Sequence, residues 1–207
     1  MSDQQYAALI PVKPPAVGKS RLAGAGPESR RALAEAFALD TVAACLAAGT
    51  VAQVLVVTDD VDVAAEVGQL GAASLPDGVS GDLNGTLRQA AAEAARRWPG
   101  LRPVALCADL PALRPADLDA TLARVVTSHP WFVPDAAGVG TTMYAAACEE
   151  FDPRFGPGSR EAHRLAGAHE LPDVAASLRR DVDDLDDLRA AVALGVGPHT
   201  AAVVARS

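Results

Sequence analysis

Basic residues crowd into one short segment near the start of this sequence. The segment VKPPAVGKSRLAG holds Lys13, Lys19 and Arg21 beside two glycines. Lysine offers a compact positive charge to a phosphate, and arginine offers a forked set of donors. We therefore expect this segment to bind the phosphates of a nucleotide, and we include Ser20 among its binding residues. A solvated basic loop without a ligand is the alternative.

The letters GKS at positions 18–20 also suggest a P-loop, the phosphate cradle of many kinases. That motif would need glycine at position 13, where this chain has Lys13. Pro14 and Pro15 would in addition remove two amide donors from the cradle. The sequence thus argues against a P-loop kinase.

Aspartates mark two further segments. Asp109 follows the apolar run PVALC and stands too far before Pro115 to cap the next helix. We expect it to be exposed in a crevice at the end of a strand, as a metal ligand. Asp181 and Asp183 are two apart on a segment expected to be extended, which places both side chains on one face. Such carboxylates repel each other unless a hard cation such as magnesium neutralises them. The alternative is that the whole acidic run RRDVDDLDDL is simply the start of a helix.

Two other loops carry weaker signals. Asn84 and Gly85 stand near an expected helix start, where they could bind a nucleobase or ribose or simply form a capping turn. The segment FGPGS at 155–159 offers backbone amides ahead of a helix, which suits an anion. Thr141 and Thr142 could add hydroxyl donors.

Apolar runs alternate with segments of helical periodicity, which is typical of an α/β fold with a mostly parallel sheet flanked by helices. We expect strands at 6–12, 53–58, 73–75, 103–107, 131–133, 141–147 and 179–182. Expected helices cover 27–48, 61–70, 83–98, 115–125, 160–168 and 184–194. In such sheets the ligand crevice lies at the carboxyl ends of the strands. The basic segment VKPPAVGKSRLAG and Asp109 both stand at such strand ends. No composition shift marks a linker, so we expect one domain over 1–207.

Composition excludes several classes of protein. The chain has 207 residues, with 18 Lys and Arg against 26 Asp and Glu, and its net charge of −8 disfavours nucleic acid as a partner. No apolar run approaches the roughly 20 residues of a membrane span, and the first residues do not resemble a signal peptide. Three widely spaced cysteines suggest a reducing cytoplasm. The four histidines lack metal-ligand spacing, and no nucleophile motif is present.

Five motifs occur in order over nearly the whole chain: IPVKPPAVGKSRLAG, GDLNGTL, CADLPAL, FGPGS and RRDVDDLDDL. Together they resemble the guanylyltransferases of coenzyme F-420 biosynthesis, which act on 2-phospho-L-lactate or phosphoenolpyruvate. The resemblance implies a Rossmann-like nucleotidyltransferase fold. It also implies that GMP from GTP is joined to a phosphorylated three-carbon acid, with release of pyrophosphate.

The same resemblance assigns roles to individual residues. It implies that Asp109, Asp181 and Asp183 hold magnesium, and that Thr141, Gly156 and Ser159 bind the phosphorylated acid. It places Lys13, Lys19 and Arg21 around the triphosphate and Asn84 and Gly85 near the nucleoside. The residues expected to act in catalysis are Lys13, Lys19, Arg21 and Asp109.

The identity of the acceptor acid is inferred only from the amino-acid composition of the chain. The chain is rich in alanine and arginine and has only two lysines, which suggests a high-GC bacterium, where the resembling enzymes use phosphoenolpyruvate. We therefore expect phosphoenolpyruvate, with 2-phospho-L-lactate and 3-phosphoglycerate as alternatives. A molybdenum-cofactor or sugar-phosphate type of nucleotidyltransferase and a catalytically silent nucleotide-binding regulator remain open as well.

Overall fold

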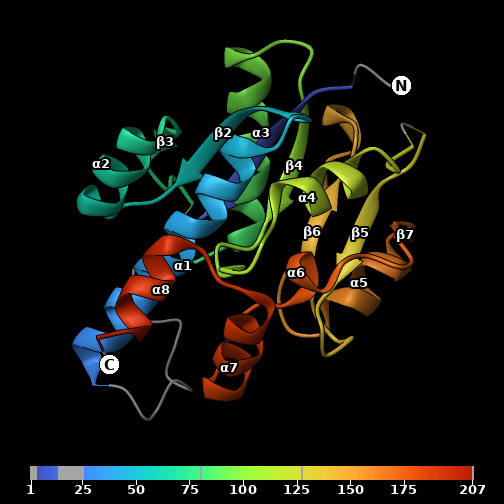
Figure 1. Ribbon diagram of the computed structural model, residues 1–207. Helices are drawn as coiled ribbons and strands as arrows, with labels where there is room; N and C mark the ends of the chain where they lie inside the picture. Colours follow the sequence, from blue (N-terminus) through green and yellow to red (C-terminus); the bar gives the residue numbers. More distant parts are fainter. Residues whose placement is uncertain (1–3, 14–25, 80, 127, 207) are drawn as a thin grey trace.

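A seven-stranded sheet forms the centre of the molecule in the computed structural model, which describes residues 4–13, 26–79, 81–126 and 128–206 (Figure 1). The strand order is β3-β2-β1-β4-β6-β5-β7. The strands are β1 (Tyr6–Pro11), β2 (Val51–Val57), β3 (Ala73–Leu75), β4 (Arg102–Leu106), β5 (Trp131–Pro134), β6 (Thr141–Ala145) and β7 (His169–Glu170). The predicted α/β class is therefore confirmed.

Strand direction decides which ends of the strands meet at one edge. Strands β3, β2, β1 and β4 run parallel, whereas β6 is antiparallel to both of its neighbours, β4 and β5. The start of β6 at Thr141 therefore lies beside the carboxyl ends of β4 and β5. This reversal brings Thr141 to the edge where Asp109 follows β4.

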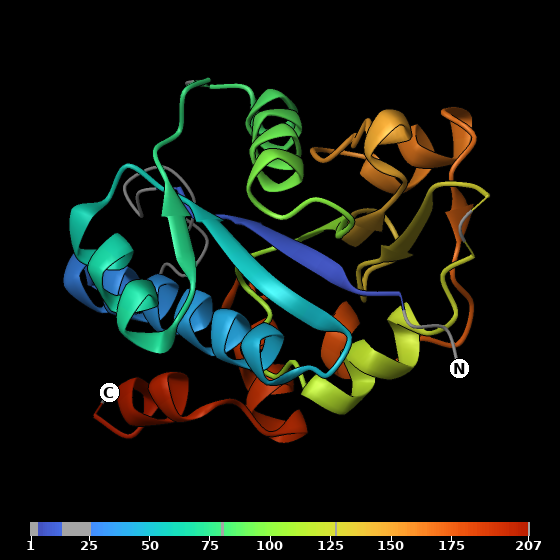
Figure 2. The ribbon, with the colours of Figure 1, turned by 90° about the horizontal axis from the view of Figure 1, so that it is seen from above.

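Helices cover both faces of the sheet (Figure 2). The first face carries α1 (Pro27–Ala47), α2 (Val61–Leu70), α4 (Pro115–Leu122) and α6 (Ala176–Arg179). The second carries α3 (Leu83–Arg97), the short 3-10 helix η1 (Cys148–Glu150) and α5 (Ser159–Leu165). Helices α7 (Leu185–Leu194) and α8 (Pro198–Val204) pack beside α1. Because both faces are covered, the central strands bury both sets of their side chains, and this explains their continuous apolar runs.

Several predicted elements are confirmed, two of them to the residue. The helix at 61–70 and the strand at 73–75 have the expected bounds, and Gly71 between them adopts a left-handed φ of 102°. The predicted strand at 179–182 is wrong. Arg179 ends the helical turn of α6, and the next three residues join no strand. A single buried valine, Val182, anchors that segment, and its amide donates a bond of 3.1 Å to the Asp109 carbonyl.

The sequence analysis did not foresee α8, whose position depends on one buried acid. Asp40 in α1 is 4 % exposed, and its two oxygens accept bonds from the amides of His199 (3.0 Å) and Thr200 (2.8 Å) at the start of α8. A helix start leaves its first amides without intrahelical partners. Asp40 supplies the side-chain acceptor for these amides, because the N-cap residue of α8, Gly197, has no side chain that could accept. A distant capping residue of this kind gives no local signal.

Replacing Asp40 by alanine is expected to lower the free energy of unfolding by about 2 kcal/mol, because a buried amide, that of Thr200, and a part-buried one, that of His199, lose their acceptors. Thermal unfolding should then shift down by about 5 °C for a chain of this size. Asp40→Asn keeps one acceptor oxygen and should lose less. Equal melting temperatures for Asp40→Ala and the unchanged protein would contradict this account of α8.

Candidate active site

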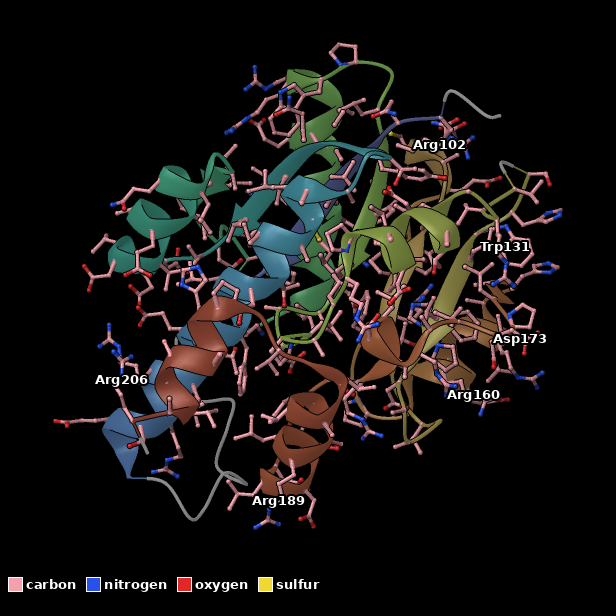
Figure 3. The ribbon with its side chains drawn as sticks, viewed as in Figure 1. Arg102, Trp131, Arg160, Asp173, Arg189 and Arg206 are labelled. Carbon is pink, nitrogen blue, oxygen red and sulfur yellow. The ribbon has the colours of Figure 1, made fainter. Side chains whose placement is uncertain are left out.

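The candidate site lies at the carboxyl edge of the parallel strands. Lys13 follows β1, Asp109 follows β4, and Thr141 begins β6. In Figure 3, Arg102 at the start of β4 and Arg189 of α7 mark opposite ends of the molecule. The candidate site lies toward the end of the molecule where Arg189 is labelled. Lys13 is exposed, whereas Lys19, Ser20 and Arg21 lie outside the described residues. Their assignment to the triphosphate stays a prediction.

Asp109 is held in place by neighbours from two other elements. The Thr41 hydroxyl of α1 accepts a bond of 3.1 Å from the Leu110 amide and lies 3.2 Å from the Ala108 carbonyl. The Asp109 carbonyl accepts from the Val182 amide. These contacts fix the backbone on both sides of Asp109. The side chain is half-buried with Oδ1 out of contact with solvent, so it is less exposed than we expected.

The three predicted metal ligands act on one another electrostatically. Burial is the main cause that raises the pKa of Asp181 to about 7, and the negative charges of Asp109 and Asp183 raise it further. Such mutual repulsion requires that the carboxylates share one region of the molecule. Segments 72 residues apart in the sequence therefore bring their acids together, although the segment of Asp181 and Asp183 is not the strand that we predicted.

A fourth carboxylate belongs to this group. Asp135, which follows β5, also raises the pKa of Asp181 by its charge. Its own oxygens accept bonds from the amides of Val139 (2.9 Å) and Gly140 (2.7 Å), which closes the hairpin between β5 and β6. The sequence analysis missed Asp135. It follows an apolar strand just as Asp109 does, so the same reasoning could have found it.

The donor set suits a hard divalent cation, because carboxylate oxygens are the ligands that magnesium and manganese prefer and a cation would relieve the repulsion around Asp181. Within the described part of the chain, however, no group of three His, Cys, Asp or Glu side chains is arranged to hold a metal ion. The acids therefore share a neighbourhood without forming a closed metal cage. Their role as ligands stays a prediction.

The predicted acid-binding residues gather around a buried histidine. Thr141 and Ser159 are 5 % and 2 % exposed. The Nδ1 atom of His163 lies 3.0 Å from the Thr141 hydroxyl and 2.8 Å from the Ser159 carbonyl. Gly156, with a φ of 134°, turns the chain into α5 in a conformation that other residues rarely adopt. The structure thus brings Thr141, Gly156 and Ser159 into one region and adds His163.

Asn84 joins the nucleoside side of the predicted site to this region. Its Oδ1 accepts a bond of 2.8 Å from the Phe155 amide, and its Nδ2 donates one of 2.9 Å to the Phe155 carbonyl. Both ends of the amide are therefore engaged with one backbone. The neighbouring Gly85 amide donates to the Asp82 carboxylate at 2.9 Å, as the capping alternative expected. The nucleoside role of Asn84 and Gly85 stays a prediction.

Comparison with known proteins decides the family. A family model described as guanylyl transferase CofC like matches residues 6–200. This chain belongs to that family. It is also 51 % identical over 203 residues to a phosphoenolpyruvate guanylyltransferase of Thermomonospora curvata, covering 97 % of this chain and 89 % of the relative. As a member of the CofC-like family, the chain is a nucleotidyltransferase.

Solved structures agree with the fold of the CofC-like family. A nucleotide-diphospho-sugar transferase structure from Desulfovibrio desulfuricans G20 superposes with a TM-score of 0.66 at 20 % identity, over 91 % of this chain and 85 % of that one. A Mycobacterium tuberculosis H37Rv protein, crystallised with manganese, superposes with a TM-score of 0.51 at 20 % identity, over 93 % and 100 % of the two chains. The predicted Rossmann-like nucleotidyltransferase fold is confirmed. Among the described residues, no helix has the length and apolarity to span a membrane.

Proposed function

We propose that this chain joins GMP from GTP to phosphoenolpyruvate, with release of pyrophosphate, in coenzyme F-420 biosynthesis. The observation that carries the proposal is the 51 % identity to a phosphoenolpyruvate guanylyltransferase over almost the whole chain. The group of acids around Asp181 supports it, because one of them, Asp135, accepts a bond from the amide of Gly140, the residue before Thr141. GTP, the phosphorylated acid and a divalent metal are then the partners of one site at the carboxyl edge of the sheet.

In the proposed reaction a phosphate oxygen of phosphoenolpyruvate forms a bond to the α-phosphorus of GTP. The bond from that phosphorus to the β-phosphate oxygen breaks, and the electron pair leaves with pyrophosphate. A phosphate monoester has a second pKa near ~6, so it is largely dianionic at neutral pH and needs no general base. The protein must therefore bring two anions together and orient them in line.

Different residues of the chain are proposed to bind the triphosphate, the metal, the phosphorylated acid and the nucleoside. We propose that Lys13, Lys19 and Arg21 offset charge on the triphosphate, with Ser20 as a further donor. Asp109, Asp181 and Asp183 would hold magnesium, and the bound cation would supply positive charge that offsets the repulsion between the phosphate groups. Thr141, Gly156 and Ser159 would bind the phosphorylated acid, and Asn84 and Gly85 would lie near the nucleoside.

The test is a direct comparison of acceptors. The purified protein is incubated with GTP, magnesium and one of three acids: phosphoenolpyruvate, 2-phospho-L-lactate or 3-phosphoglycerate. Mass spectrometry of the adduct and a pyrophosphate assay give the result. We expect the phosphoenolpyruvate adduct to form fastest. A faster reaction with either other acid would reassign the acceptor, and nucleotide binding without pyrophosphate from any acid would indicate a silent regulator.

A variant at Asn84 tests how the two halves of the site are connected. Asn84→Ala removes both bonds to the Phe155 backbone, so we expect the KM for the phosphorylated acid to rise about tenfold. Asn84→Asp keeps the acceptor for the Phe155 amide and should show a smaller rise. Steady-state kinetics with each substrate varied in turn give the measurement. A rise confined to the KM for GTP would instead support a direct nucleoside contact.

Two further proposals concern the chain as a whole. We propose that residues 1–207 form one nucleotidyltransferase domain, because a single sheet takes strands from Tyr6 to Glu170. We also propose a cytoplasmic location. The three described cysteines of the chain, Cys45, Cys107 and Cys148, form no disulfide, as is usual in a reducing compartment.

A further inference from the structure

We propose that His163 is a positioning residue for the acceptor acid, because it directs the hydroxyl hydrogen of Thr141 away from the imidazole ring and toward the bound acid. The inference rests on the proposed function, in which Thr141 binds the acid. His163 was set aside in the sequence analysis because it lacks metal-ligand spacing. Its contacts indicate a different task, which depends on which ring nitrogen carries the proton.

The hydrogen-bond network assigns that proton. The Arg154 backbone amide donates a bond of 2.9 Å to Nε2 of His163. A backbone amide can only donate, so Nε2 must be the unprotonated, accepting nitrogen of a neutral ring. Nδ1 then carries the hydrogen. It can donate to the Ser159 carbonyl at 2.8 Å and to the Thr141 oxygen at 3.0 Å.

The assigned tautomer fixes the polarity of the Thr141 hydroxyl. Since Nδ1 of His163 is a donor, the Thr141 oxygen accepts from it and cannot donate back. Among the described residues, His163 is the one side chain that lies within hydrogen-bond distance of that hydroxyl. The hydroxyl hydrogen is therefore available to an acceptor outside this network. A carboxylate or phosphate oxygen of the acid is such an acceptor, and the opposite tautomer would turn the hydrogen toward the ring.

Packing holds the ring in one orientation. His163 is fully buried and stacks on Tyr144 and Phe132, with ring centroids 4.9 Å and 5.3 Å apart. Phe155 meets the ring edge-on at 5.6 Å. Aromatic contacts of this kind resist rotation of the imidazole, so its two nitrogens keep separate partners.

The backbone of β6 brings Thr141 to this ring. Val133 pairs with Met143, whereas the next residue, Pro134, pairs with Thr141, so Thr142 is an extra residue in the pairing. A β-bulge of this kind redirects a side chain relative to regular alternation. The bulge explains how Thr141 reaches the face of the sheet where Tyr144 packs against His163.

The first experiment reads the tautomer without any activity measurement. In the full-length protein labelled with ¹⁵N, long-range correlation spectra of the histidine rings distinguish a protonated Nδ1 from a protonated Nε2. We expect the buried ring of His163 to carry its hydrogen on Nδ1 at neutral pH, and His163→Phe identifies its signals by their loss. A hydrogen on Nε2 would overturn the inference.

The second experiment is a double-mutant cycle on the KM for phosphoenolpyruvate. Thr141→Val and His163→Phe should each raise this KM about tenfold and leave the KM for GTP within about twofold. Because His163 acts through Thr141, the double variant should be no worse than Thr141→Val alone. Multiplied effects in the double variant would overturn the inference.

Conservative variants separate positioning from mere support of the fold. Thr141→Ser keeps the hydroxyl, and His163→Asn keeps an amide donor near the Nδ1 position, so both should recover part of the lost affinity. A low KM in His163→Phe at full folding would overturn the inference. If the unchanged protein forms no adduct at all, the proposed function fails. If it forms the adduct while Nε2 carries the hydrogen, only the role of His163 fails.

Discussion

Asp109→Asn is expected to release pyrophosphate about 10³-fold more slowly than the unchanged protein, because under the proposed function the variant loses a negative charge that would hold the cation between two polyanions. The substitution keeps the shape of the side chain. It also keeps the backbone bond from Val182 to the Asp109 carbonyl. The measurement is pyrophosphate release with GTP, magnesium and phosphoenolpyruvate, together with a thermal unfolding curve.

The size of this effect follows from the charges involved. Two unit charges 4 Å apart repel by about 4 kcal/mol at an effective dielectric constant of 20, and GTP and phosphoenolpyruvate bring several such pairs together. The chain itself carries a net charge of −8, so its overall field also opposes binding. A local concentration of cations would reverse this, and under the proposed function acids such as Asp109 recruit them.

The folded state should tolerate the loss of Asp109 charge well. Its carboxylate contributes to the repulsion that raises the pKa of Asp181, so Asp109→Asn removes an unfavourable interaction from the native state. We expect an equal or higher melting temperature. Glu149→Gln is the matched control, since Glu149 is exposed in η1, beyond the opposite end of β6. Near-normal turnover in folded Asp109→Asn would exclude this residue from the mechanism.

The fold was largely predictable because its strands are buried on both faces. The strands β1, β2 and β4 can be recognised from their own continuous apolar runs, without knowledge of the strands that pair with them. Gly71 likewise marks the end of a helix, because its backbone adopts a left-handed conformation. The errors fall where distant contacts decide the structure. The segment 179–182 has the residue pattern of a strand, but Arg179 ends α6 and the Val182 amide is bonded to the carbonyl of Asp109, 73 residues earlier.

The sequence indicates a candidate residue where a polar side chain stands out against its apolar surroundings. A carboxylate at the end of an apolar strand is unfavourable without a partner, so Asp109 was conspicuous in the sequence. His163 and Asp135 were missed for opposite reasons. His163 depends on partners from β6, α5 and the segment before Gly156, whereas Asp135 gives the same signal as Asp109 and was overlooked.

Acid should destabilise the protein over a defined pH range because of His163. Burial is the main cause that lowers the pKa of His163 to about 4, and the nearby charge of Arg154 lowers it as well, whereas the Ser159 carbonyl and the charge of Asp152 act in the opposite direction. In the unfolded chain the same ring has its ordinary pKa of about 6.5. The unfolded state therefore takes up a proton first as the pH falls.

The sign of the effect follows from this order of protonation. Above about pH 6.5 the ring is neutral in both states and contributes no pH dependence. Between about pH 6.5 and about pH 4 only the unfolded state gains the proton, so the free energy of unfolding falls with pH by up to about 3 kcal/mol. Below the lower value both states are protonated and the loss is complete. Protonation of the folded ring would place a new N–H at Nε2, facing the Arg154 amide donor.

A denaturant series across this range, run on the unchanged protein and on His163→Gln, isolates the contribution. Other groups, including Asp181 with its raised pKa, titrate in both proteins and cancel in the difference between them. We expect the advantage of the unchanged protein over His163→Gln to shrink steadily as the pH falls from about 6.5 toward about 4. Parallel curves for the two proteins would mean that the ring is already charged, or freely exposed, in the native state. Such a result would also remove the assignment of a neutral ring with its hydrogen on Nδ1, since a charged ring carries a hydrogen on both nitrogens and could not accept a bond from the Arg154 amide at Nε2.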